Sequence, residues 1–235
     1  MNNAKEIVEA SGTVIIKNLT KILPLGSVAV EIYEELQSKQ AERKVQRLVE
    51  LYINLSEKVN AVENKINHEF ISKDDFLDVF EETTRYVVLE RQEQKRRFFQ
   101  NILVNSMIST ECDYDKTERY YRLLDNLGML ELNVLAVLDD PGKYNKEQGM
   151  IIGDTFHSAY MTVSKEVSAL GGVTKLLNLK VHQAEEAVTV LFSNGLVVEN
   201  SMNKHLNTNG NAVHVLDNLL TIRGRDFVRF LKDVK

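Results

Sequence analysis

Seven apolar residues in the first half of the chain recur at alternating intervals of three and four, the pattern that most constrains the fold. Residues at these intervals share one face of an α-helix, so the run predicts a seam on a long helix that starts near Ser27. Two interpretations fit: the seam packs within the chain, or it pairs with a second copy as a short coiled coil. The seam residues are Val45, Leu48, Tyr52, Leu55, Val59, Val62 and Ile66.

Proline and glycine are scarce, with 2 and 11 residues in a chain of 235. Because these residues break helices most strongly, their scarcity predicts a mainly α-helical protein. The net charge of −5 gives no overall attraction to nucleic-acid phosphates or anionic lipid. Cys112 is the single cysteine, so no intrachain disulfide can form, and we expect a cytoplasmic protein.

A polar and acidic stretch, residues 109–117, separates two parts of different character. We expect a helical bundle with an oligomerisation role over residues 1–110. A second domain of short helices and a small β-hairpin is expected over residues 118–235.

The first half also contains local signals. Pro24 and Gly26 predict a break after an amphipathic helix over residues 4–23. Ser72 is a good N-cap for a later helix, because its hydroxyl can accept a hydrogen bond from a free backbone N–H of the first turn. The charged run at residues 90–97 predicts a solvated hinge with internal ion pairs, or else a phosphate contact through its cations.

The second half alternates short helices with turn signals. We expect a helix over residues 154–169 that stops at Gly171 and Gly172, and another over residues 179–193. A strand, a polar loop and a returning strand are then expected at residues 196–199, 200–211 and 212–216.

This order of elements resembles a winged-helix domain. The turn that opens the wing matches Gly195, and the Leu-Thr pair followed by glycine before the last helix matches Leu220, Thr221 and Gly224. The resemblance implies three helices with a small β-hairpin, and it leaves the function open.

Three short patterns extend the likeness over most of the chain. They are Pro24 with Gly26, Asp75 with Phe76 and Phe80, and Lys95 with Arg96, Phe98, Ile102 and Leu103. In this layout the chain resembles a group of uncharacterised bacterial helical proteins with a C-terminal winged helix, and it is similar to abortive-infection alpha proteins. That likeness implies a role in bacterial defence against phage.

A winged helix suggests DNA binding, with the helix at residues 179–193 in the major groove. Glu185 and Glu186 would then face phosphates, and residues 118–235 hold 13 Lys and Arg against 14 Asp and Glu. These charges favour contact with protein over contact with DNA. The candidate nucleic-acid contacts are Lys180, Gln183, Lys204, Arg223, Arg225, Lys95, Arg96 and Arg97.

The sequence contains no catalytic, cofactor-binding or metal-binding signature. A Gly-x-Ser-x-Gly elbow, a phosphate loop and a dinucleotide-binding turn are all absent, and no two histidines stand four residues apart. The carboxylates around Cys112 oppose formation of a thiolate. We therefore expect no enzyme activity.

The expected function is that of a non-enzymatic interaction or regulatory protein. We expect a homo-oligomer formed through the helical half, together with an unidentified protein partner. A phage-defence role rests on the resemblance alone. Two alternatives are a DNA-binding transcriptional regulator and a membrane-active effector that inserts the amphipathic segment at residues 14–30, for which bundle packing is the favoured interpretation.

Overall fold

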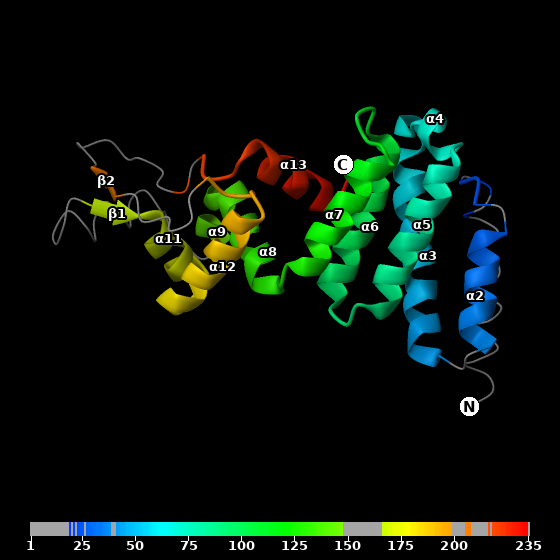
Figure 1. Cartoon of the computed structure of the whole chain (residues 1–235), viewed down its shortest axis with the longest axis horizontal. Helices are drawn as coiled ribbons and strands as arrows, with labels where there is room; N and C mark the ends of the chain where they lie inside the picture. The colour runs from blue at the N-terminus through cyan, green and yellow to red at the C-terminus, as the bar shows by residue number, and fades with distance from the viewer. Residues whose placement is uncertain are drawn as a thin grey trace. The chain divides into compact units, whose positions relative to one another are not determined.

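The computed structural model describes residues 19, 21, 23–25, 27–38, 41–147, 166–198, 205–207, 216 and 218–234. The chain is mainly α-helical, which confirms the fold class expected from the scarcity of proline and glycine (Figure 1). Its contacts divide it into two compact units. The first comprises residues 1–125 and 230–235, and the second comprises residues 126–229.

The first unit is a bundle of helices. Its longest described helix, α3, contacts α2, α5 and α6, and α5 also packs against α6. The described elements are α2 (Val28–Ser38), α3 (Glu42–Val62), the 3-10 turn η1 (Glu63–Lys65), α4 (His68–Ile71), α5 (Asp74–Leu89), α6 (Glu93–Ile108) and α7 (Tyr114–Asn126).

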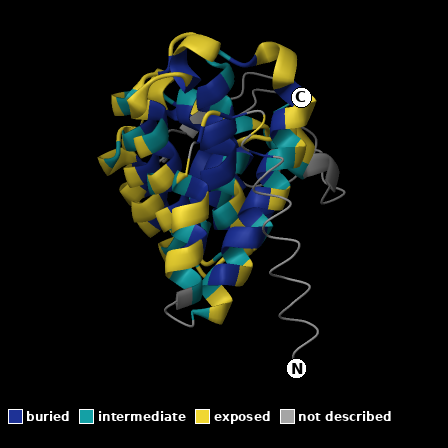
Figure 2. Ribbon diagram, turned by 90° about the vertical axis from the view of Figure 1, so that its right-hand side faces the viewer, coloured by how far each residue is buried: buried dark blue, intermediate teal, exposed yellow. Residues whose placement is uncertain are grey.

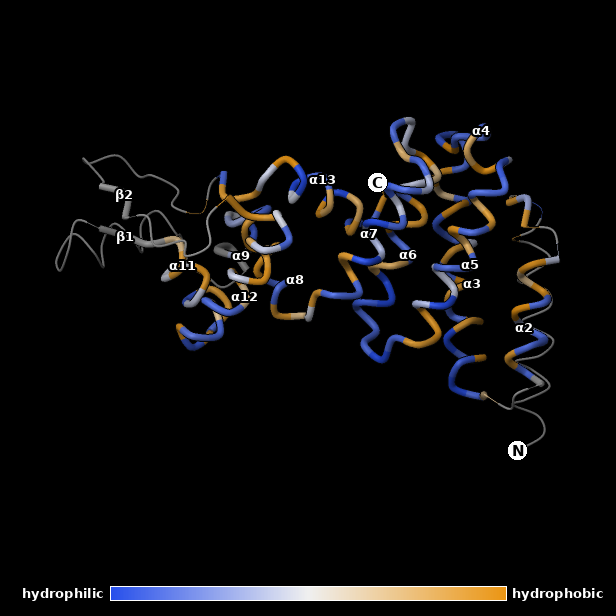
Figure 3. Tube along the Cα trace, viewed as in Figure 1, coloured by the Kyte–Doolittle hydropathy of each residue, from blue (hydrophilic) through white to orange (hydrophobic). Residues whose placement is uncertain are grey.

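Aromatic side chains fill the centre of this bundle. Tyr52 of α3 stacks on Phe80 of α5 with ring centroids 5.9 Å apart, and Tyr86 of α5 stacks on Phe99 of α6 at 4.7 Å. Buried and exposed residues alternate along the helices (Figure 2), and hydrophobic and hydrophilic residues alternate along the same trace (Figure 3). Burial of this apolar surface is the main source of the bundle's stability.

The last residues of the chain belong to the first unit. Asn101 of α6 donates a hydrogen bond to the carbonyl of Leu231 at 2.7 Å, and Asn105 donates to that of Phe230 at 3.1 Å. The Phe230 ring lies 4.9 Å from the ring of Tyr120. Two buried or half-buried amides on α6 thus bind carbonyl groups that the end of a helix leaves without intrahelical partners.

The second unit is built from shorter helices and a two-stranded sheet. The strands are antiparallel, with Val167 opposite Leu206, and a separate antiparallel bridge joins Val197 to Leu220. The described elements are α8 (Met129–Asp139), α9 (Pro141–Glu147), β1 (Glu166–Ser168), α11 (Ala169–Leu176), α12 (Val181–Ser193), β2 (His205–Asn207) and α13 (Ile222–Leu231), whose last two residues count with the first unit.

The long helix expected from Ser27 is in fact two helices. The helical run ends at Ser38, and Ala41 has a non-helical backbone (φ −87°, ψ 57°) before α3 begins. Tyr52 of α3 donates a hydrogen bond to the carbonyl of Ala29 in α2 at 3.2 Å. The first helix therefore packs against the second and buries part of its apolar surface, which one continuous helix could not do.

Two helix boundaries also differ from the expectation. Ser72 is not an N-cap: its hydroxyl donates to the carbonyl of Glu69, and α5 begins after Lys73. Gly171 and Gly172 lie inside α11 and do not end a helix. Burial of the apolar residues of α11 outweighs the weak helix propensity of glycine there.

The expected domain division falls at a different place from the division between the units. The stretch at residues 109–117 joins α6 to the first turn of α7, and both helices lie in the first unit except for Asn126, the last residue of α7. Tyr121 explains why α7 belongs there, since its ring is fully buried beside Tyr86 and Phe99.

No helix in the part of the chain that the structure describes is long and apolar enough to cross a membrane. The amphipathic segment at residues 14–30 is described only from residue 19 onward, with gaps. Leu19, Leu23, Leu25 and Ala29 are buried in the first unit, which supports bundle packing of this segment.

Candidate functional site

The apolar seam of α3 is covered by the chain itself. α2, α5 and α6 pack around this helix, and every seam residue is less than a tenth exposed. A surface buried within one chain is not available to a second copy, so this burial favours the intrachain interpretation of the seam over the coiled-coil one. The buried residues are Val45, Leu48, Tyr52, Leu55, Val59, Val62 and Ile66.

The start of α12 carries two of the predicted nucleic-acid contacts. Lys180 precedes the helix in an extended conformation, and its backbone N–H donates to the side-chain oxygen of Gln183 at 3.0 Å. The Gln183 side chain is therefore engaged in capping its own helix, while Lys180 is exposed. Lys204, another predicted contact, lies outside the described residues.

The exposed surface of α12 is acidic. From Val181 to Ser193 the helix contains no lysine or arginine, and Glu185 and Glu186 are both exposed. His182 is the remaining exposed titratable side chain on this helix. A helix with this charge pattern repels the phosphates that line a DNA groove.

Two more predicted contacts lie in the first turn of α13. Arg223 is exposed, and Arg225 donates from Nη1 to the carbonyl of Leu220 at 2.8 Å. The Arg225 guanidinium is thus held against the backbone that leads into its own helix.

A compact set of backbone contacts joins the end of α12 to the start of α13. Thr221 Oγ1 donates to the carbonyl of Gly195 at 2.7 Å and accepts from the N–H of Gly224 at 2.9 Å. The N–H of Thr221 also donates to the carbonyl of Leu196 at 3.0 Å. Thr221 therefore caps α13 and fixes it to the turn after α12.

Large apolar side chains are exposed around α12 and the segments beside it. Ile222, next to Thr221, is 81% exposed, which is unusual for isoleucine. The segments that carry these residues are linked by the Thr221 bonds and by a hydrogen bond from the N–H of Val198 to the carbonyl of Leu219. Among the described residues of the second unit, the exposed large apolar ones are Val181, Val190, Phe192, Val198 and Ile222, which we call the α12 apolar set.

The three consecutive cations of the charged run have different environments. Lys95 is buried, and its ammonium donates to the carbonyl of Asp125 at 2.9 Å and lies 3.7 Å from a carboxylate oxygen of Glu90. It is therefore not an exposed phosphate contact, which corrects that expectation. Arg96 and Arg97 line a groove between α3 and α6.

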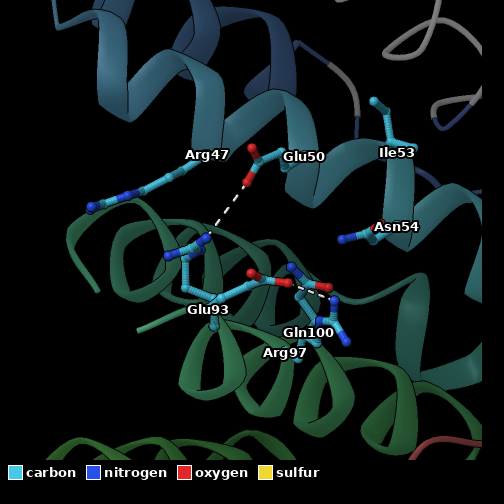
Figure 4. A pocket seen from close by; sticks show the side chains of 8 residues that line it. Arg47, Glu50, Ile53, Asn54, Glu93, Arg97 and Gln100 are labelled. Carbon is cyan, nitrogen blue, oxygen red and sulfur yellow. Dashed lines mark hydrogen bonds and ion pairs between the residues drawn. The ribbon is translucent and has the colours of Figure 1, made fainter. Parts of the chain in front are cut away.

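This groove contains a third arginine that the sequence did not single out. Arg47 of α3 lies 49 positions before Arg96 in the sequence, yet both line a cavity of about 330 Å³ (Figure 4). Nothing in the local sequence signals that Arg47 and Arg96 share a groove, because the groove follows from the packing of α3 on α6. The remaining lining residues are Glu50, Ile53, Asn54, Glu93 and Gln100.

Several buried polar groups elsewhere in the first unit bind one another. Ser106 and Thr117 share a hydrogen bond at 3.0 Å, and the buried thiol of Cys112 lies 3.1 Å from the Thr117 hydroxyl. Burial raises the pKa of the Tyr121 hydroxyl, which is hydrogen-bonded to Thr83. These contacts hold the helices together and contain no nucleophile paired with a general base.

Glu82 is the carboxylate whose environment is most unusual. Burial raises its pKa, while the guanidinium of Arg85, 3.2 Å away, opposes that shift. Its Oε2 atom is buried, and no described residue donates a hydrogen bond to it. Among the described residues, no three acidic, cysteine or histidine side chains are grouped closely enough to hold a metal ion.

In comparisons with known proteins, no family model, no curated protein and no solved structure matches the chain. The α12 apolar set and the groove between α3 and α6 are the candidate functional surfaces.

Proposed function

We propose that this chain is a non-enzymatic protein-interaction module and that its second unit is a winged-helix domain used for protein contact. The order of α8, α11 and α12, followed by the bridge between Val197 and Leu220, supports a winged-helix topology. The cap that Thr221 provides for α13, with Gly224 in its first turn, gives a structural role to the residues that carry the resemblance.

The observation that carries the proposal is the α12 apolar set. Scattered single apolar residues on a surface need no explanation, but these residues come from α12 and from two segments tied to its end. Phe192 lies three residues before Gly195, whose carbonyl Thr221 binds, and Ile222 follows Thr221 directly. Exposed aromatic and aliphatic side chains of this kind are typical anchors of protein interfaces.

The charges on α12 define the chemistry of the partner. Glu185 and Glu186 are exposed on the helix that carries Val181 and Phe192. A partner that fits this surface presents apolar side chains flanked by lysine or arginine, because opposite charges favour encounter and like charges oppose it. The acidic surface opposes nucleic acid for the same reason.

Site-specific photo-crosslinking tests the proposal. A photoreactive amino acid replaces the exposed Thr189 of α12, and the full chain is irradiated in the cells that produce it. We expect a protein adduct that disappears when Phe192→Glu is added. The adduct should persist with Leu89→Glu, a matched control that adds the same charge at an exposed apolar residue of the first unit.

Two results would overturn protein contact through this surface: an adduct equally sensitive to both substitutions, and one insensitive to Phe192→Glu. An adduct with a second copy would identify the partner as this chain itself. The rival function, a DNA-binding regulator, predicts retention on duplex DNA at low salt that weakens with Lys180→Glu or Arg225→Glu. Such retention, without a protein adduct, would replace the proposal.

A further inference from the structure

The groove between α3 and α6 has features of a binding site that the proposed function does not use. Arg47, Glu50, Ile53 and Asn54 come from α3, and residues of α6 face them across the cavity (Figure 4). Its volume of about 330 Å³ is within the range of small-ligand pockets. Both helices belong to the first unit, so the groove is formed within one compact body.

Two of the three arginines are held in place by backbone carbonyls. Arg47 donates from Nη1 to the carbonyl of Val88 at 2.9 Å and to that of Leu89 at 3.3 Å. Arg96 donates from Nη1 to the carbonyl of Arg91 at 3.0 Å. A guanidinium has five N–H donors, so these bonds orient each group and leave further donors for an anion.

The charges in the groove do not cancel. No ion pair joins Arg47 to a carboxylate within the part of the chain that the structure describes. Arg96 lies 3.6 Å from Glu50, too far for a good hydrogen bond, whereas Arg97 binds Glu93 at 2.6 Å. Three arginines against two glutamates leave one positive charge without a counter-ion in the groove.

Gln100 provides an independent indication of a ligand. It lines the groove with only 3% of its surface exposed, and no described residue donates a hydrogen bond to its side-chain oxygen Oε1. A buried polar atom without a partner costs stability, so such an atom beside a cavity indicates a missing donor.

We propose that the α3–α6 groove binds a small phosphate-bearing molecule. The oxygens of the phosphate accept hydrogen bonds from Arg47, Arg96 and Arg97, because guanidinium matches the geometry of phosphate oxygens. Hydrogen phosphate also carries an O–H group near neutral pH, and this group supplies the donor for Gln100. Sulfate has a similar shape and charge but no such proton, so the site should distinguish the two anions.

Calorimetric titration of the full chain tests this proposal. The probes are inorganic phosphate, adenosine monophosphate as a phosphomonoester, and sulfate, at about pH 5.5, where a phosphomonoester also keeps one O–H group. We expect phosphate to bind more tightly than sulfate by about tenfold, the factor for loss of one good hydrogen bond. Tighter binding of the phosphomonoester than of free phosphate would identify an organic phosphate as the ligand, and the reverse order would identify phosphate itself.

Substitutions assign the binding to the groove. Arg97→Gln should weaken phosphate about tenfold, because a charge-assisted hydrogen bond is lost. Arg122→Gln is the matched control, since Arg122 is equally exposed, pairs with Glu118 four residues earlier as Arg97 does with Glu93, and lies outside the groove. The control should bind as the unaltered chain does.

A variant that is expected to bind phosphate more tightly separates loss of the site from loss of the fold. Glu50→Gln removes the carboxylate that competes for Arg96, so phosphate binding should tighten several-fold, and a damaged fold could not produce that result. The proposal is overturned by no heat of binding at about 10 mM phosphate, by equal affinity for phosphate and sulfate, or by equal effects of Arg97→Gln and Arg122→Gln.

Discussion

Gly224 lies so close to the carbonyl oxygen of Leu196 that a Cβ atom placed on it would be 2.1 Å from that oxygen. The contact brings the first turn of α13 against the residue that follows the α12 turn, within the second unit. Thr221 bonds both segments at this contact: its hydroxyl donates to the carbonyl of Gly195 and accepts from the N–H of Gly224. Glycine is required here because of close approach and not because of an unusual backbone angle.

Substitution of Gly224 by alanine should destabilise the second unit. The methyl group cannot be accommodated unless α13 moves away from Leu196, and overpacking of this kind costs about 1–3 kcal/mol. Urea denaturation followed by circular dichroism measures the loss. Gly142→Ala is the control: it is exposed in α9 and its added Cβ would meet only the Asp140 side chain, at 3.7 Å. Equal stability of the two variants would contradict the close approach.

The hydroxyl group of Thr221 should contribute more to stability than the shape of the Thr221 side chain does. Thr221→Val keeps the volume and the branched side chain but removes the N-cap of α13 and the bond to Gly195, so we expect a loss of about 1–2 kcal/mol. Thr221→Ser retains the hydroxyl and should recover most of that loss. Urea midpoints of the two variants decide the question, and a valine variant as stable as the serine variant would show that the hydroxyl is not needed.

The resemblance to a winged helix was useful because it identified residues whose geometry is local. Thr221 and Gly224 are three residues apart, and a cap followed by a tight helical turn can be anticipated from that spacing. The seam of α3 was visible for the same reason, because helical periodicity is a local property. The sequence did not show which elements pack on the seam, and only the folded chain shows that α2, α5 and α6 cover it.

What the sequence could not predict depends on contacts between distant segments. Arg47 and Arg96 line the same groove because α3 packs on α6, and Gln100 becomes a buried acceptor only in that packing. The run at residues 90–97 looked uniformly solvated, yet Lys95 turns inward to the carbonyl of Asp125 at the end of α7. No periodic pattern carries such information, since it arises from tertiary structure.

Lys95 should therefore act as a structural residue. Lys95→Met keeps the length of the side chain but leaves the carbonyl of Asp125 without its donor and the carboxylate of Glu90 without its ion-pair partner, so we expect a loss of about 1–3 kcal/mol. Lys73→Met removes a lysine from an exposed pair with Glu69 and should change stability by less than about 0.5 kcal/mol. Thermal and urea unfolding of both variants provide the comparison. If the Lys95→Met chain were as stable as the control, Lys95 would not be needed for the fold.

The buried carboxylate of Glu82 should make stability depend on pH. Burial raises its pKa in the folded chain above the ordinary value of 4.5, so the folded state binds a proton more readily than the unfolded state does. Below both pKa values the group is protonated in each state and imposes no penalty. As the pH rises through the interval between them, the unfolded state ionises first, and the contribution of Glu82 to stability becomes unfavourable.

Glu82→Gln should therefore stabilise the chain near neutral pH, because the amide keeps the shape of the side chain without a charge to bury. The gain should shrink as the pH is lowered to about 4, where glutamate is itself largely protonated in the folded chain. Glu81→Gln changes the neighbouring, exposed residue of α5 and should have little effect at either pH. Urea midpoints at about pH 7 and about pH 4 test this difference. A glutamine variant less stable than the unaltered chain at neutral pH would mean that the ion pair with Arg85 outweighs the burial of the carboxylate.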